Sequence, residues 1–230
     1  MPLTIATNLI FPFIISFIGI GFLYANTALF FKDNSVQKKV SKVFIVYLLA
    51  LSVIETVCHG IGLFSYIFGM LRLDANFFVS HLYFIFQFVF LSYLFYGIIK
   101  NKRIKNTIVI VFFVEMVLLA FSYISNPGLF WQFNTFEIVS TSFVLITYAF
   151  TFIFLNIDKV HKYFNFCIGL ILYLLCSASI FMSGNTDLVL FSNAYIYIDI
   201  WVLNSIFYIV FQYKIYQEYR FLKAGRIKQI

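Results

Sequence analysis

Residues 77–105 read FFVSHLYFIFQFVFLSYLFYGIIKNKRIK, a long and mostly apolar run that ends in a cluster of basic residues. A helix needs about 20 apolar residues to cross a hydrocarbon core about 30 Å thick. The stretch therefore predicts a membrane-crossing helix that stops where Lys100 begins a polar loop. A transmembrane strand would show about ten residues of alternating polarity, and this run does not alternate.

The same pattern recurs along the whole chain of 230 residues. The composition agrees with it, because 63% of the residues are hydrophobic, only 11% are charged and the mean hydropathy is +0.96. We therefore expect one all-α domain over residues 1–230, an integral membrane bundle of seven transmembrane helices. The expected spans are 4–31, 43–70, 77–99, 107–125, 136–156, 164–184 and 194–216.

The basic residues predict how this bundle is oriented. All but one of the 16 Lys and Arg residues fall in four segments on one side of it, and the exception is Arg72. The four segments hold Lys32, Lys38, Lys39 and Lys42; Lys100, Lys102, Arg103 and Lys105; Lys159 and Lys162; and Lys214, Arg220, Lys223, Arg226 and Lys228. Basic loops stay in the cytoplasm. The amino terminus is therefore expected outside and the carboxyl terminus inside, with 217–230 as a short basic tail.

The same basic face bears on the partners of the protein. The inner loops account for the net charge of +7, so this charge does not indicate a nucleic-acid partner. Lys and Arg beside a membrane attract anionic lipid headgroups. We expect the lipid bilayer as the main partner, and the basic loops and tail are also suited to docking a cytoplasmic protein.

Eight polar residues inside the expected spans are the candidate ligand-binding residues, because polar groups at bilayer depth are costly and mark functional sites. At about 1.5 Å of rise per residue, half of them fall near the midplane and half in the outer part of the membrane. The midplane group is Glu55, Gln87, Glu115 and Asn204, and the outer group is His59, His81, Glu137 and Asp199.

Glu55 and His59 form the sharpest local pattern, because residues four apart share one face of a helix and can interact directly. This pair predicts a ligand pocket or a proton-responsive pair. The alternative is an interhelical hydrogen-bond network, which membrane bundles commonly contain.

Helical geometry separates the other candidates. His81 and Gln87 are about 120° apart around their helix, and Asp199 and Asn204 are about 140° apart. One narrow site that holds all of these side chains is therefore not expected. Two neighbouring sites, or one site together with packing contacts, fit the spacing better.

No catalytic residue and no cofactor is predicted, and a bound metal is the alternative. Imidazole and carboxylate groups suit zinc and related ions, although no spacing such as His-Glu-x-x-His occurs. The candidate metal ligands are His59, His81, Glu137 and Asp199. A metal held there would activate water for attack on a lipid ester or amide.

Three stretches of the chain resemble a group of uncharacterised bacterial inner-membrane proteins with seven helices. They are HLY at 81–83 with QF at 87–88 and LSYLFY at 91–96; FEIVS at 136–140; and residues 201–204 with 168–179 before them. The resemblance covers residues 77–216. It implies a multi-pass protein of the bacterial cytoplasmic membrane, and it implies no activity.

The resemblance also marks His81, Glu137 and Asn204 as polar positions typical of that group. This chain departs from the group at two places. Gln87 stands where a Glu is usual, and Ile200 stands where a His is usual. Each departure removes a group that could bind a metal or transfer a proton.

Three functions remain open at this stage. The favoured one is a non-enzymatic module that binds or senses a ligand, or acts as a scaffold, with an outward-facing polar pocket and a basic cytoplasmic surface. The second is a metal-dependent membrane lipid hydrolase. The third is a small solute transporter whose midplane site would include Glu55, Gln87, Glu115 and Asn204. We favour the first because the chain has no catalytic signature.

Overall fold

The structure is a computed structural model that describes residues 3–68, 75–157, 161–182, 189–192 and 197–225. Side chains are described for 14–61, 78–157, 161–182, 190 and 201–225. The expectations made for Arg72, Lys159, Arg226 and Lys228, and for the side chain of Asp199, lie outside these residues.

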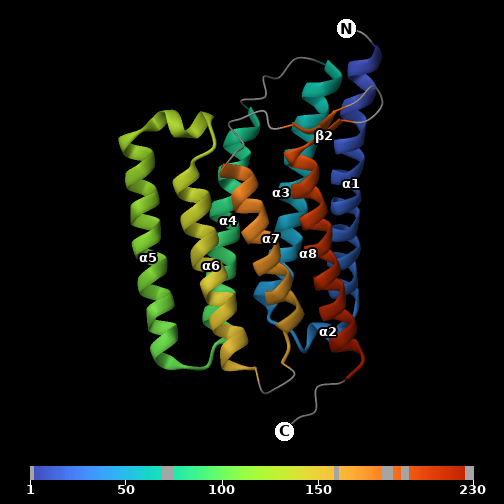
Figure 1. The fold of residues 1–230 in the computed structure, drawn as a ribbon. Helices are drawn as coiled ribbons and strands as arrows, with labels where there is room; N and C mark the ends of the chain where they lie inside the picture. Colours follow the sequence, from blue (N-terminus) through green and yellow to red (C-terminus); the bar gives the residue numbers. More distant parts are fainter. Residues whose placement is uncertain (1–2, 69–74, 158–160, 183–188, 193–196, 226–230) are drawn as a thin grey trace.

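Long helices joined by short connections make up most of the described chain (Figure 1). The α-helices are α1 (Leu3–Lys32), α2 (Asn34–Gln37), α3 (Lys42–Phe68), α4 (Ala75–Ile98), α5 (Lys102–Ser125), α6 (Thr135–Leu155), α7 (Phe164–Met182) and α8 (Ile200–Lys223). The shorter elements are the 3₁₀ helix η1 (Pro127–Trp131) and two strands, β1 (Val189–Ser192) and β2 (Tyr197–Asp199), which pair antiparallel.

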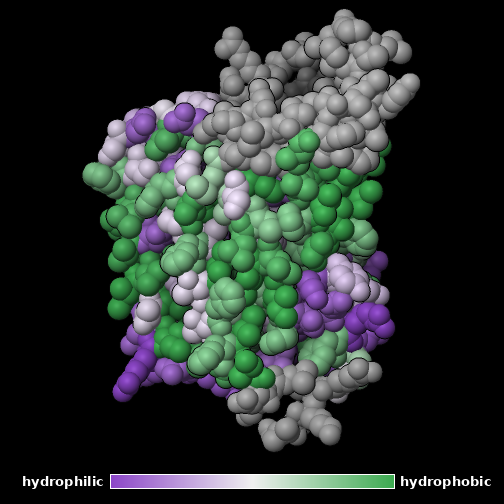
Figure 2. Space-filling model, in the orientation of Figure 1, coloured by the Kyte–Doolittle hydropathy of each residue, from purple (hydrophilic) through white to green (hydrophobic). Residues whose placement is uncertain are grey.

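Six helices are long and apolar enough to cross a membrane, as expected of a multi-pass membrane protein: α1, α3, α4, α5, α6 and α7. Figure 2 shows hydrophobic residues over the middle of the visible face and hydrophilic ones gathered mainly toward its lower end. The prediction of long apolar membrane helices is confirmed. The count of seven spans and the direction of the termini stay predictions, because α8, with 24 residues, is not among the six.

Helix α5 begins five residues earlier than the hydropathy pattern predicts, at Lys102 instead of 107. Asn101 caps this helix, because its side-chain oxygen accepts hydrogen bonds from the backbone N–H groups of Arg103 (2.9 Å) and Ile104 (3.4 Å). Asn is among the preferred residues at this position. The basic cluster that marks the loop in the sequence is therefore the first turn of α5.

Helix α8 is displaced along the chain relative to the predicted span 194–216. It begins only at Ile200, because the residues directly before it form β2. It continues to Lys223, because Glu218 and Leu222 are both fully buried. The expected tail 217–230 is thus helical over its first half and packs into the bundle.

Six of the helices close into a ring. α1 packs on α3, α3 on α4, α4 on α6, α6 on α7, α7 on α8, and α8 back on α1. α5 lies outside this ring against α4 and α6, and it stands at the left edge of the bundle in Figure 1. Aromatic side chains fill the half of the ring interior that lies toward the carboxyl-terminal end of α8. Phe44, Phe166 and Phe211 are fully buried there, and the Phe44 and Phe166 rings lie 5.0 Å apart.

Asp33 ties the α1–α2 connection to α8 at the same end of the bundle. One of its carboxylate oxygens accepts from the backbone N–H and the hydroxyl of Ser35, and the other accepts from the Tyr219 hydroxyl at 3.0 Å. These hydrogen bonds, that of the Ser35 hydroxyl first, hold the pKa of Asp33 below its usual value. Asp33 therefore stays ionised and caps α2 at neutral pH.

Gly169 allows α7 and α8 to approach closely. A Cβ at this position would lie 2.6 Å from the Lys214 Cβ and 3.2 Å from the Phe211 Cδ2. Because the Lys214 Cβ is fixed to its helix, an added methyl group would push the two helices apart. We expect Gly169→Ala to lower the free energy of unfolding by about 1–3 kcal/mol, measured by denaturant titration in detergent micelles.

Gly97→Ala in α4 is the matched control, because nothing lies within 4 Å of the position that its Cβ would take. Ala has a higher helix propensity than Gly, so this change is expected to be neutral or slightly stabilising. Equal losses of stability in the two variants would contradict a close approach at Gly169.

Candidate functional site

A cavity of about 210 Å³ lies inside the ring, between the middle of α3 and the first turns of α4 and α8. Side chains from α1, α3, α4, α7 and α8 line it. They are Ser16, Glu55, Cys58, His59, Ser80, Tyr83, Phe84, Tyr173, Phe181, Trp201, Asn204, Ser205 and Tyr208. Among these described lining residues one is a carboxylic acid and none is Lys or Arg. The cavity therefore combines polar and aromatic side chains inside the ring.

Glu55 supplies the acidic group of this cavity from the middle of α3, about 20 Å along the helix from Lys42. It is buried, with 9% of its surface exposed. The Tyr208 hydroxyl lies near its carboxylate but does not reach hydrogen-bond geometry. The Glu55 carboxylate thus faces the cavity, with the Tyr208 hydroxyl of α8 beside it.

His59 lies one helical turn from Glu55, as the sequence predicted. Its Nδ1 is 2.9 Å from the backbone oxygen of Glu55 and 3.4 Å from the Glu55 Oε2, and its Nε2 contacts the Ser16 hydroxyl. A neutral ring that donates from Nδ1 to the backbone oxygen and accepts at Nε2 satisfies the two hydrogen bonds. His59 is therefore engaged with α1 and α3, which leaves the carboxylate as the group that can meet a ligand.

The α8 side of the cavity adds a second acceptor. The Asn204 Oδ1 is buried and has no hydrogen-bond partner among the residues that the structure describes. Trp201, one turn earlier, packs edge-on against Phe181 of α7, with 5.2 Å between the ring centroids. Across the cavity the hydroxyls of Tyr83 and Tyr173 lie 3.1 Å apart. The walls thus combine oxygen acceptors with aromatic rings.

Of the candidate residues whose side chains the structure describes, the cavity brings together Glu55, His59 and Asn204. Gln87 is 2% exposed and lies beside Tyr47, and it does not line the cavity. Glu115 of α5 is also buried away from the cavity, where its Oε1 accepts from the Ser140 hydroxyl of α6. The midplane group predicted from the sequence is therefore spread over separate parts of the bundle.

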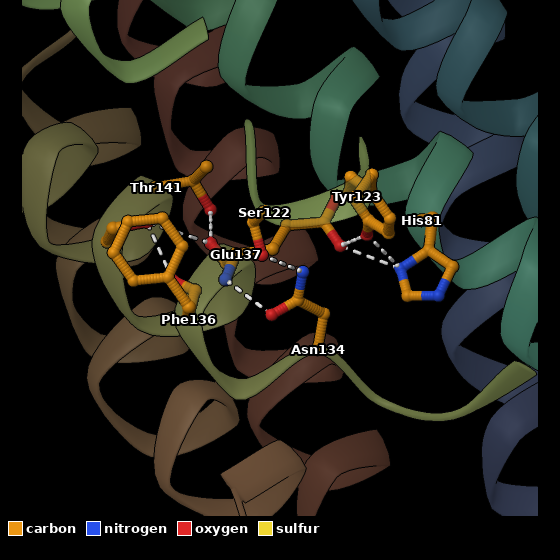
Figure 3. Close-up of polar contacts among 8 residues, drawn as sticks. His81, Ser122, Tyr123, Asn134, Phe136, Glu137 and Thr141 are labelled. Carbon is orange, nitrogen blue, oxygen red and sulfur yellow. Dashed lines mark hydrogen bonds and ion pairs between the residues drawn. The ribbon is translucent and has the colours of Figure 1, made fainter. Parts of the chain in front are cut away.

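A second polar cluster joins α4, α5 and α6 (Figure 3). The His81 Nδ1 is 2.6 Å from the Glu137 Oε2, and both side chains are buried, with 3% and 0% exposure. The Tyr123 hydroxyl donates to the same carboxylate oxygen and lies 2.8 Å from the His81 Nδ1. This cluster links three helices through one carboxylate.

Local capping positions Glu137 in this cluster. The Asn134 side chain caps α6 and accepts from the backbone N–H of Glu137 at 3.3 Å (Figure 3). The Thr141 hydroxyl donates to the backbone oxygen of Glu137 at 2.7 Å. Phe130 of η1 covers the cluster, stacked on Tyr123 with 4.4 Å between ring centroids and edge-on to His81 at 6.3 Å. The cluster is therefore enclosed between three helices and η1.

The two histidines of the proposed metal set belong to different clusters. His59 contacts Glu55 and Ser16, whereas His81 contacts Glu137 and Tyr123. Within the described part of the chain, no three His, Cys, Asp or Glu side chains come close enough to share a metal ion. The described residues thus offer no set of three or four converging ligands, which a zinc site requires.

Sequence reasoning did not single out the aromatic lining of the cavity, which includes Tyr83, Tyr173 and Tyr208, or the role of Tyr123 in the second cluster. With 33 Phe and 16 Tyr residues in the chain, no aromatic position stands out from its neighbours. Comparisons with known protein families, with curated proteins and with solved structures find no match to this chain. The resemblance seen in residues 77–216 therefore stays a prediction.

Proposed function

We propose that this protein is a non-enzymatic membrane module that binds a small organic ammonium ion in the cavity of the ring. The composition of the lining carries this proposal. One carboxylate and one amide oxygen without a partner among the described residues meet six Phe, Tyr and Trp side chains there, and none of the described lining residues is Lys or Arg. Such a surface accepts hydrogen bonds and positive charge.

The chemistry of an ammonium ion matches each part of this lining. Its N–H groups would donate to the Glu55 carboxylate and the Asn204 Oδ1, and hydrogen bonds between charged groups are stronger than neutral ones. Its positive charge would be attracted to the aromatic rings of the lining, such as Tyr83 and Trp201, by about 0.5–2 kcal/mol for a well-placed ring. A buried carboxylate is costly without a partner, and a bound cation offsets that cost.

The size of the cavity limits the ligand. Pockets for drug-sized molecules measure about 300–1,000 Å³, whereas this cavity measures about 210 Å³. An ion with a few carbon atoms therefore fits better than a lipid or a peptide. A metal ion fits less well, because the lining offers only one carboxylate and its walls are largely aromatic.

The packing of the ring favours binding over transport. The cavity occupies the half of the interior near the first turns of α4 and α8. In the other half, Phe44, Phe166 and Phe211 are fully buried and fill the space between α3, α7 and α8. This arrangement supports a site that is closed on the side of the basic residues.

We propose that α8 is the seventh membrane span, because it completes the ring by packing on both α1 and α7. The basic residues at the ends of α1 and α8 and at the start of α5 then place that side of the bundle in the cytoplasm. The amino terminus would be outside and the cavity would lie in the outer half of the membrane. This is the arrangement expected in a bacterial cytoplasmic membrane.

Calorimetric titration of the purified protein in lipid nanodiscs tests the ligand class. We expect n-butylammonium to bind and neutral n-butanol to bind at least about tenfold more weakly, because only the former pairs with a carboxylate. Glu55→Gln keeps the size of the side chain and removes its charge. It should weaken n-butylammonium binding by about tenfold or more, since hydrogen bonds to charged groups contribute about 1.5–3 kcal/mol.

Glu115→Gln is the matched control, because it removes another buried carboxylate that lies between α5 and α6. Its affinity for n-butylammonium should equal that of the wild type. Equal affinities for n-butanol and n-butylammonium would contradict a cation site, and so would an unchanged affinity in Glu55→Gln.

A further inference from the structure

A second concave surface lies outside the ring, between α4 and α5. This α4/α5 groove measures about 360 Å³, and its walls are almost entirely apolar. Val89, Tyr93 and Tyr96 of α4 form one wall, and Val109, Phe112 and Phe113 of α5 form the other. Because α5 packs only on the edge of the ring, the groove opens on the outer surface of the bundle.

The position of the groove along the helices matches one leaflet of a bilayer. The basic first turn of α5 begins at Lys102, and the groove reaches Phe113, which is about 16 Å further along the helix. Half of a hydrocarbon core about 30 Å thick is about 15 Å. The groove therefore spans the depth of the acyl chains on the basic side of the protein.

Basic residues cluster at the end of the groove that lies next to the first turn of α5. Lys100, Lys102 and Arg103 are exposed there, and the Lys105 Nζ lies 5.0 Å from the centre of the Tyr96 ring, which is itself part of the wall. None of these cations forms an ion pair with an acidic residue whose side chain the structure describes. Their charge is thus free to meet an anion that sits above the groove.

We infer that the α4/α5 groove is a binding site for an anionic phospholipid. One acyl chain would lie between Tyr93 of α4 and Phe113 of α5, and the phosphate would face Lys102 and Lys105 in the first turn of α5. The apolar walls account for the chain, and the basic turn accounts for the preference for a negative headgroup. This site is separate from the cavity that contains Glu55, so it stands whether or not that cavity binds ammonium ions.

Native mass spectrometry tests this inference on protein exchanged into an equimolar mixture of dioleoyl phosphatidylglycerol and dioleoyl phosphatidylcholine. We expect one retained phosphatidylglycerol per chain, about tenfold more abundant than retained phosphatidylcholine. Lys102→Gln with Lys105→Gln should reduce the retained phosphatidylglycerol by roughly tenfold or more, because each basic group near the membrane surface contributes about 1 kcal/mol. Val109→Trp should fill the groove and reduce the retention of either lipid.

The matched control is Lys32→Gln with Lys38→Gln, which removes the same charge from the α1–α2 region. It should retain phosphatidylglycerol as the wild type does. Equal retention of the two lipids would overturn the inference, and so would an equal loss in the control, which would indicate diffuse attraction. A dimer of the chain that carries no lipid and that Val109→Trp dissociates would instead assign the groove to a second copy.

Discussion

Glu218→Ala is expected to lower the free energy of unfolding by about 3–5 kcal/mol. Glu218 is fully buried, and its two oxygens accept from the backbone N–H groups of Tyr163 (2.6 Å) and Asn165 (3.1 Å). Each hydrogen bond to a charged group contributes about 1.5–3 kcal/mol. Without the carboxylate, the first turn of α7 loses its acceptors.

The backbone at this point adds to the dependence on Glu218. Tyr163 has a φ of +73°, a conformation that non-glycine residues rarely adopt. Its hydroxyl also accepts from the backbone N–H of Ser41 at 2.6 Å, so that the turn connects α3, α7 and α8. The contacts from Glu218 and Ser41 together hold Tyr163 in this conformation.

Denaturant titration in detergent micelles measures the effect. Glu218→Gln keeps one neutral acceptor and should lose about 1–2 kcal/mol. Gln217→Ala is the control, because this neighbouring side chain is half-buried and accepts from the Lys214 Nζ of its own helix. It should stay within about 1 kcal/mol of the wild type. A loss at Glu218 no greater than that at Gln217 would contradict the proposed role.

Glu137→Ala is expected to cost about 3–5 kcal/mol, because it breaks a buried pair and removes the carboxylate that the His81 ring and the Tyr123 hydroxyl share. His81→Ala should cost a similar amount. The double variant should cost less than the sum of the two by about 0.5–3 kcal/mol, since each single change already removes the shared contact. The same unfolding titrations, run as a double-mutant cycle, measure this coupling.

Additive losses at His81 and Glu137 would show that the two side chains do not depend on each other, against the 2.6 Å contact between them. Thr147→Ala in α6 serves as the control for the cycle, because its exposed hydroxyl donates to the backbone oxygen of Phe143 in its own helix. It should show no coupling to His81→Ala.

The apolar runs predicted most of the helices, because a helix that crosses a membrane needs about 20 predominantly apolar residues. The span expected at 136–156 became α6, Thr135–Leu155, with almost the same ends. The predicted helix boundaries are wrong where polar contacts determine where a helix begins or ends. Asn101 caps α5 inside the basic cluster, and Glu218 joins the part of α8 beyond the expected end at 216 to the start of α7. Neither contact is visible in a hydropathy pattern.

In the candidate site, a contact between residues close together in the sequence was predicted, and contacts between residues far apart in the sequence were not. Glu55 and His59 were predicted to meet because they are four residues apart on one helix. His81 and Glu137 are 56 residues apart, and their contact depends on how α4 packs on α6. Asn204 reaches the cavity because α8 closes the ring against α1. How the helices pack in the ring depends on the shapes of their surfaces. The spacing of residues along the chain does not reveal these shapes.

The most direct test of the ammonium site is an anomalous-scattering map from crystals of the protein grown with 3-bromopropylammonium. We expect one bromine peak inside the cavity near Trp201, with the ammonium nitrogen about 2.7–3.2 Å from the Glu55 carboxylate. A cavity without bromine at a saturating concentration of the ligand, or a bromine peak only outside the ring, would contradict the proposed function.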